Sequence, residues 1–276
     1  MPFIQSHGLS YYYQIHGSGP TLVLLHGFTG STANWVELIR PFSERFRVLL
    51  LDLPGHGRTA SPTDPERYTM ERVSRDLLAI FEALQLSDIS LLGYSMGGRL
   101  AIYIACKHPT SFKKLIIESA SPGLASRSER RLRVKSDTHL ANEIARDGIP
   151  AFIERWQKLP LFASQQQLPL ERRQRLHKQR LNNSALGLAN SLRGMGTGRQ
   201  PSLWTELGSL QLPVLILAGE EDAKFTGIAT RMAAELPRAS LEIVPGAGHN
   251  IHLEKPQLFT DIVTGYLNRA REAVPS

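Results

Sequence analysis

Residues 89–98 read Ile-Ser-Leu-Leu-Gly-Tyr-Ser-Met-Gly-Gly, an apolar run that leads into the pattern Gly-x-Ser-x-Gly. This pattern is typical of a nucleophile elbow, in which the serine occupies a sharp turn between a strand and a helix. Glycines flank Ser95 because a side chain at Gly93 or Gly97 would clash with the neighbouring strand or helix. The pattern also occurs by chance in glycine-rich loops, but here a helical pattern with apolar residues at 100, 102, 104 and 105 follows it. We therefore predict that the Ser95 hydroxyl projects over the end of a sheet.

The size of the chain fits one large domain, or a core with one insertion, because 42% of its 276 residues are hydrophobic. No apolar run approaches the roughly 20 residues that a membrane span needs, and residues 1–10 lack the features of a signal peptide. We expect a cytoplasmic protein without stable membrane insertion. The single cysteine, Cys106, excludes an internal disulfide, and its apolar neighbours predict a small core residue rather than a nucleophile.

The net charge of +7 comes from one segment of the chain. Residues 121–212 contain 15 Lys and Arg against 7 Asp and Glu, a net of +8, whereas the other residues sum to −1. Twelve of these cations are arginines, scattered along helical patterns without an aromatic nucleic-acid signature, so we expect no nucleic-acid partner. Most should lie on solvated helix faces. A subset that faces a pocket would bind carboxylates.

Alternation of strands and helices predicts the fold class. An opening hairpin around Gly8 is followed by apolar runs at 21–25, 47–51, 89–94, 115–118, 214–217 and 241–244, and helical patterns lie between them (31–44, 68–86, the segment after 95, 227–236 and 256–269). This order is typical of an α/β protein with a mostly parallel central sheet and helices on both faces. Residues 126–193 contain no strand candidate. We therefore predict a core of residues 1–120 and 213–276 with a helical cap insertion at 121–212.

A serine hydroxyl needs an imidazole partner and a carboxylate that fixes the tautomer of that imidazole. Asp222 and His249 each follow a predicted strand, and the order Ser95, Asp222, His249 is the one that an elbow of this kind requires. Among the alternatives, His252 already enters the next element, and Glu220 and Glu221 are weaker than Asp222.

The loop His26-Gly27-Phe28-Thr29-Gly30 lies between an apolar strand and a helix start, where backbone N–H groups point at an anion. We predict an oxyanion hole from the backbone N–H groups of Phe28 and Met96. A second loop, residues 52–57, borders the same edge of the sheet, and we expect Asp52 and His56 to hold it through hydrogen bonds.

Together these motifs resemble the α/β-hydrolase superfamily along nearly the whole chain. Narrower features are similar to the 2-succinyl-6-hydroxy-2,4-cyclohexadiene-1-carboxylate synthases of menaquinone and phylloquinone synthesis. These features are Gly93-Tyr94-Ser95-Met96-Gly97-Gly98-Arg99, Glu118 with Pro122-Gly123-Leu124, Trp156 with Pro160-x-Phe162-Ala163-Ser164, Arg180-x-Asn182-Asn183, Gly219-Glu220-x-Asp222-x-Lys224-Phe225 and Gly248-His249-Asn250-x-His252.

The resemblance implies a cofactor-free lyase, without a metal, that removes a proton next to a ketone and expels pyruvate from an enolpyruvyl ether. Its substrate would be a small polycarboxylate. The motif positions imply that the substrate residues are Tyr94, Arg99, Arg133, Trp156 and Arg180. For the third of these, the nearby Arg130 and Arg131 are alternatives.

Other functions fit the same pattern less well. A serine hydrolase of an ester, thioester or carbon–carbon bond would use the same triad, but it would favour an apolar pocket over a cationic cap. A ligand receptor on this fold would retain the triad without using it. A dehalogenase or epoxide hydrolase needs a carboxylate nucleophile where this chain has Ser95. The sequence does not indicate an oligomeric state.

Overall fold

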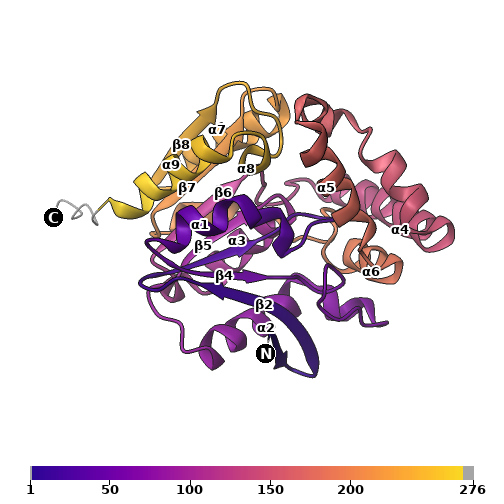
Figure 1. Cartoon of the computed structure of the whole chain (residues 1–276), viewed down its shortest axis with the longest axis horizontal. Coiled ribbons are helices and arrows are strands. Elements are labelled where there is room, and N and C mark those ends of the chain that lie inside the picture. Colours follow the sequence, from indigo (N-terminus) through magenta and orange to yellow (C-terminus); the bar gives the residue numbers. More distant parts are fainter. Residues whose placement is uncertain (1, 270–276) are drawn as a thin grey trace.

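The central sheet carries the fold (Figure 1). The computed structural model describes residues 2–269. Within them the strands are β1 (Phe3–Ser6), β2 (Leu9–His16), β3 (Thr21–Leu25), β4 (Arg47–Leu51), β5 (Ser90–Tyr94), β6 (Lys114–Glu118), β7 (Val214–Gly219) and β8 (Ala239–Val244). Their order across the sheet is β1-β2-β4-β3-β5-β6-β7-β8. The pairs β1–β2 and β2–β4 are antiparallel and all others are parallel, which confirms the predicted hairpin and the mostly parallel sheet.

Helices connect the strands. The α-helices are α1 (Val36–Ser43), α2 (Met70–Ala83), α3 (Met96–Lys107), α4 (Arg127–Trp156), α5 (Leu170–Leu181), α6 (Ala185–Met195), α7 (Ala223–Glu235), α8 (Ile251–Glu254) and α9 (Pro256–Asn268). Short 3-10 helices are η1 (Thr32–Trp35), η2 (Pro65–Tyr68), η3 (Pro109–Ser111), η4 (Pro160–Gln167) and η5 (Trp204–Ser209). No helix within residues 2–269 is long and apolar enough to cross a bilayer.

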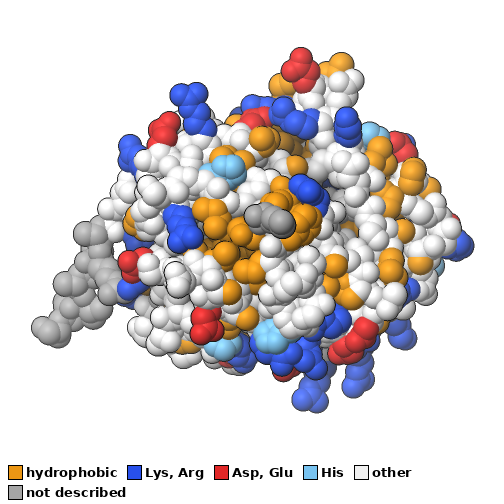
Figure 2. Space-filling view, turned by 60° about the horizontal axis from the view of Figure 1, so that its bottom comes forward, with side chains coloured by type: hydrophobic (Ala, Val, Ile, Leu, Met, Phe, Trp, Pro, Cys, Tyr) orange, Lys and Arg blue, Asp and Glu red, His pale blue; other side chains and the backbone are white. Residues whose placement is uncertain are grey.

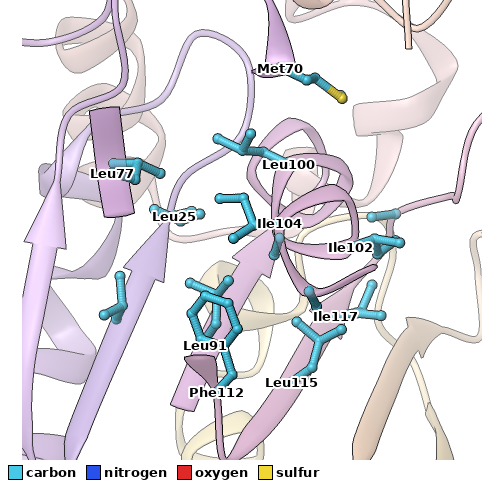
Figure 3. Packing of buried hydrophobic residues seen from close by; sticks show 14 of the residues in the cluster. Leu25, Met70, Leu77, Leu91, Leu100, Ile102, Ile104, Phe112, Leu115 and Ile117 are labelled. Atoms are coloured by element: carbon cyan, nitrogen blue, oxygen red, sulfur yellow. The ribbon is translucent and has the colours of Figure 1, made fainter. Parts of the chain in front are cut away.

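Both faces of the sheet are buried because successive side chains of each strand point to opposite sides. On β3, Val23 and Leu25 join one apolar cluster, whereas Leu22 and Leu24 join another. Helices α2, α3 and α7 pack against the first cluster, and α1 and α9 pack against the second. Figure 3 shows part of the first cluster, where residues of α3 lie over the strands. The continuous apolar runs that predicted the strands are therefore explained by burial on both sides.

Between β6 and β7 the described chain forms only helices and loops. Helices α4, α5 and α6 lie together beside the sheet, on the right in Figure 1, and have an apolar cluster of their own. Helix α4 is kinked at Gly148, where φ is +78°, and Pro150 follows two residues later. A glycine with positive φ followed by a proline accounts for the kink.

The start of α7 differs from the sequence prediction. We expected a helix from Gly227, but α7 begins at Ala223, so the prediction was four residues late. The reason is Asp222, whose side chain accepts a hydrogen bond from the N–H of Phe225 and so caps the helix. The first predicted helix also differs, since residues 32–35 form a 3-10 turn before α1.

Candidate active site

Ser95 lies in the sharp turn between β5 and α3, as the Gly-x-Ser-x-Gly pattern predicts. Its backbone is strained, with φ +50° and ψ −107°, and its N–H donates to the carbonyl of Glu118 over 2.9 Å. A Cβ on Gly97 would overlap the carbonyl of Leu25, and one on Gly93 would overlap the carbonyl of Gly97. Both glycines are therefore required where α3 approaches the sheet.

A chain of two hydrogen bonds joins Ser95, His249 and Asp222. The Oγ of Ser95 is 3.1 Å from Nε2 of His249, and Nδ1 of His249 is 2.6 Å from Oδ2 of Asp222. Since a carboxylate only accepts, Nδ1 carries the proton and donates it to Asp222, which leaves Nε2 free to accept from the serine hydroxyl. The structure thus brings together the three side chains that the sequence singled out. This geometry suits general-base activation of Ser95.

The alternatives to these residues have other positions. His252 is fully buried, and its Nδ1 lies 2.7 Å from Oε2 of Glu118, while its N–H donates to Oε1 of the same carboxylate. Glu220 accepts from the N–H of Gly246, and Glu221 is exposed. His252, Glu220 and Glu221 take no part in the hydrogen bonds that join Ser95, His249 and Asp222.

The N–H groups of Phe28 and Met96 have no acceptor within residues 2–269. Both residues line the cavity that contains Ser95. The loop that carries Phe28 is fixed by His26, whose Nδ1–H donates to Gly27 O over 2.8 Å and whose Nε2 accepts from the N–H of Leu53 over 3.0 Å. Two free donors beside a serine hydroxyl can hold an oxyanion.

The loop after β4 has the structural role expected for it. Asp52 accepts from the N–H groups of Thr32 (2.6 Å) and Arg58 (2.7 Å), so its carboxylate ties this loop to the start of η1. His56 bonds the carbonyl of Pro54 through Nδ1. Burial lowers the pKa of His56 to about 3 and that of His26 to about 4. Both rings are therefore neutral at physiological pH.

Ser95 opens into a cavity of about 400 Å³ that lies between the sheet edge and the helices that follow β6. Charged side chains among its lining residues are four cations and one acid, namely Arg99, Arg133, Lys224, Arg231 and Glu129. Aromatic side chains also line it, namely Phe28, Tyr94, Trp156, Phe162, Trp204 and Phe225. This combination suits a ligand with an apolar ring and several carboxylates.

Arg99 and Arg133 supply one cationic wall. Arg99 donates through Nη1 to the carbonyl of Met195 (2.9 Å) and to Oε1 of Gln200 (3.2 Å). Burial and the nearby charge of Arg133 lower the pKa of Arg99 to about 10, so Arg99 stays charged at neutral pH. Arg133 donates to Asp137 over 2.6 Å and faces the cavity.

Of the alternatives to Arg133, neither Arg130 nor Arg131 is among the lining residues of the cavity. Arg130 instead bonds the carbonyls of Leu124 and Ala125.

Tyr94 and Trp156, two of the predicted substrate residues, line the cavity. Burial raises the pKa of Tyr94 well above its ordinary value, and the carboxylate of Glu118 raises it further, so its hydroxyl stays a donor. The buried Nε1 of Trp156 has no hydrogen-bond partner within the described chain. An N–H without a partner in a largely buried position suits a ligand acceptor.

Arg180 is placed differently from the other predicted substrate residues, since it does not line the Ser95 cavity. Its guanidinium lies 5.0 Å from the ring centroid of Phe162 and donates to Oε1 of Gln165 over 3.0 Å. It lines a separate cavity of about 300 Å³ beside α5. Burial lowers its pKa to about 10, and no carboxylate of residues 2–269 lies within 4.0 Å of it. Phe162, which contacts Arg180, lines the Ser95 cavity.

Two cations of the cavity and one buried pair were not predicted from the sequence. Lys224 and Arg231 lie on α7, and their common face was hidden because we expected that helix to begin later. The sequence contained one signal of the Glu118–His252 pair, namely an acidic residue directly after the apolar run of residues 115–117.

Residues 2–269 hold no cluster of His, Cys, Asp and Glu that could bind a metal ion. Cys106 is a partly buried free thiol whose pKa burial raises to about 11, as expected for an unreactive packing residue.

Known proteins share this sequence and fold. A family model described as alpha/beta hydrolase fold matches residues 20–256. The 2-succinyl-6-hydroxy-2,4-cyclohexadiene-1-carboxylate synthase of Pectobacterium atrosepticum is 34% identical over 250 residues, 90% of this chain and 94% of that one. A Bacillus subtilis protein provisionally named for the same activity is 44% identical over 259 residues, 92% of this chain and 94% of its own.

Among solved structures, MenH from S. aureus superimposes with a TM-score of 0.89 at 36% identity, over 93% of this chain and 97% of that one. The chain therefore belongs to the 2-succinyl-6-hydroxy-2,4-cyclohexadiene-1-carboxylate synthase family of the α/β-hydrolase fold.

Proposed function

We propose that this protein eliminates pyruvate from 2-succinyl-5-enolpyruvyl-6-hydroxy-3-cyclohexene-1-carboxylate, which gives 2-succinyl-6-hydroxy-2,4-cyclohexadiene-1-carboxylate for menaquinone or phylloquinone synthesis. The observation that carries the proposal is a Ser95–His249–Asp222 chain that opens into a cavity with four cations and one acid. Relatives named for this activity support the choice of substrate. A cytoplasmic location stays a prediction from the sequence.

In the proposed reaction the Ser95–His249 pair removes the ring proton next to the succinyl ketone. The electrons of the broken C–H bond enter an enolate and then form the C2–C3 double bond. The existing C3–C4 double bond moves to C4–C5 at the same time, and the C5–O bond to the enolpyruvyl group breaks. That group leaves as the enolate of pyruvate and takes up a proton, so one pyruvate forms for each diene. Asp222 stabilises the imidazolium that His249 becomes.

The enolate oxygen would lie against the N–H groups of Phe28 and Met96. Both donors lack a protein acceptor in the described chain, and both residues line the cavity. Fixed donors stabilise the enolate more than the ketone, because negative charge develops on the oxygen only during the reaction.

Carboxylates of the substrate would bind Arg99 and Arg133, with Tyr94 and Trp156 as additional donors. We keep Arg180 among the proposed substrate residues for two reasons. It occupies a motif position of the family, and its buried charge has no carboxylate partner within residues 2–269. Its guanidinium contacts Phe162, which lines the Ser95 cavity, and its charge acts on Tyr94, which lines the same cavity. We also propose that residues 121–212 act as a cap over the core of residues 1–120 and 213–276, since cap side chains form one wall of the cavity.

The test is an assay of pyruvate release. The purified protein is mixed with the enolpyruvyl cyclohexene precursor, and pyruvate is measured with lactate dehydrogenase while the diene is followed by its absorbance. We expect equal amounts of pyruvate and diene, and loss of both in the Ser95→Ala protein. No pyruvate release by the wild-type protein would contradict the proposal.

A further inference from the structure

One face of α7 forms a wall of the Ser95 cavity. Lys224, Ile228 and Arg231 all line the cavity, and their spacing of four and three residues places them on one side of the helix. Seven residues of α-helix rise about 10 Å, so the two cations lie at opposite ends of this stripe. Arg99 and Arg133 come from α3 and α4. The cavity therefore has cations on two separate walls.

The two α7 cations have no acidic partner. Neither Lys224 nor Arg231 lies within 4.0 Å of a carboxylate in residues 2–269, whereas Arg133 is paired with Asp137. Both side chains belong to exposed residues, so water covers their charges when the cavity is empty. A carboxylate that enters the cavity meets two charges that the protein has not neutralised.

Arg231 is held in place by an aromatic support. Its guanidinium carbon lies 3.8 Å from the ring centroid of Trp204. The indole in turn donates through Nε1 to the carbonyl of Gly123 over 2.9 Å, and both residues line the cavity. An arginine stacked in this way keeps its donors free at the edge of the guanidinium plane.

Lys224 is close to the candidate triad. Its ammonium lies 5.4 Å from the ring centroid of Phe225, and that ring lies 4.6 Å from the ring of His249. The stripe on α7 therefore runs from the neighbourhood of the triad to Trp204.

We propose that Lys224 and Arg231 form a subsite for the terminal carboxylate of the substrate's succinyl chain, an inference that rests on the proposed function. With the ring carbon and the ketone at Ser95, the succinyl chain continues for two methylene groups beyond the ketone to a flexible carboxylate. Exposed cations at the ends of a stripe that begins near the triad suit such a carboxylate, whereas the half-buried Arg99 suits one attached close to the ring.

The test uses two stable aromatic probes that differ in this carboxylate. One is 2-(3-carboxypropanoyl)benzoate, which keeps the ring carboxylate and the succinyl chain, and the other is 2-butanoylbenzoate, which lacks the terminal carboxylate. Calorimetric Kd values are measured for the wild-type protein, for Lys224→Gln, Arg231→Gln and the double variant, and for Arg75→Gln. Arg75 is a matched control, since it is an exposed arginine on α2 that does not line the cavity.

For each single variant we expect the dicarboxylate to bind about two- to five-fold more weakly, and for the double variant about ten-fold or more, since exposed ion pairs contribute modestly. Binding of 2-butanoylbenzoate should not change. Raising the salt from about 0.05 M to about 0.5 M should weaken dicarboxylate binding less in the double variant than in the wild type.

Equal losses for both probes, or Kd values like those of Arg75→Gln, would overturn the subsite. These binding measurements need no turnover, so they distinguish its failure from that of the proposed function, which the pyruvate assay tests. With substrate, the double variant should have a raised KM and a kcat close to that of the wild type. A loss confined to kcat would also overturn the proposal.

Discussion

At the scale of single residues, Ser95 and His249 share one proton across a 3.1 Å contact. We predict that Ser95→Ala and His249→Ala each lower kcat for pyruvate release about 10²- to 10⁴-fold, the range of general-base catalysis. Because the two side chains act as one unit, the double variant should be no slower than the worse single variant. Circular dichroism would check that each variant is folded. A Ser95→Ala protein with near-normal turnover would remove Ser95 from the mechanism.

Arg99 is predicted to contribute through the charge of its half-buried side chain. Replacement by Ala should lower kcat/KM by about 2–5 kcal/mol, because it leaves a desolvated substrate carboxylate without its partner. Arg99→Lys should recover part of the loss, since it restores the charge but not the planar pair of donors. Arg131→Ala is the matched control, because Arg131 is exposed and does not line the cavity. Equal kinetics for Arg99→Ala and Arg131→Ala would contradict the assignment.

The meeting of Ser95, Asp222 and His249 could be predicted because each follows a strand, and parallel strands end at one edge of the sheet. Arg180 could not be placed in the same way. Whether its side chain faces the Ser95 cavity depends on how α5 packs and on Phe162, which contacts it. The direction of a side chain on a helix is set by tertiary packing, which a motif does not encode.

At the scale of elements, the buried pair of Glu118 and His252 joins the end of β6 to α8. We predict that Glu118→Ala lowers the free energy of unfolding by about 3–5 kcal/mol, because it leaves a buried imidazole and a backbone N–H without an acceptor. Urea unfolding would measure this change. Glu235→Ala, an exposed change on α7, should stay within about 0.5 kcal/mol of the wild type. A similar small change for Glu118→Ala would show that the pair contributes little.

The first residue of α7 could not be predicted from the sequence pattern. A helix from Gly227 was expected from apolar spacing, yet Asp222 caps the helix four residues earlier while it also bonds His249. One carboxylate thus fixes both the imidazole of His249 and the helix that carries Lys224 and Arg231. Apolar spacing does not reveal such a cap, because the first turn of α7 has few buried side chains.

At the scale of the whole molecule, the surplus of positive charge comes from residues 121–212. On the face shown in Figure 2, Lys and Arg side chains lie in several separate places among neutral and acidic ones. Several arginines of residues 121–212 pair with acids, such as Arg155 with Asp147 and Arg172 with Glu37. Most arginines of this segment are exposed, as expected for solvated helix faces. The composition showed which segment of the chain carries the surplus charge. The fold was needed to show which of the cations line the cavity.

Stability of the whole fold should depend on pH through His26 and His56. Burial lowers their pKa values to about 4 and about 3, so the unfolded chain binds protons near pH 6.5 that the folded protein does not. The free energy of unfolding should therefore fall as the pH drops below about 6.5, by up to about 2.7 kcal/mol per pH unit from these two groups. Unfolding curves between pH 7 and pH 4.5 would measure the slope. His56→Gln should reduce it by about one proton, and an unchanged slope would show that His56 is not a source of the pH dependence.

The central claim is that Ser95 acts in proton removal and is never acylated. Rapid-quench intact-mass spectrometry during turnover of the enolpyruvyl precursor tests it most directly, because a serine hydrolase must pass through an acyl-enzyme. We predict an unmodified protein mass at every time point, together with slower turnover when the ring proton next to the ketone is deuterium and proton removal limits the rate. An adduct on Ser95 that forms and decays at the rate of turnover would contradict the claim.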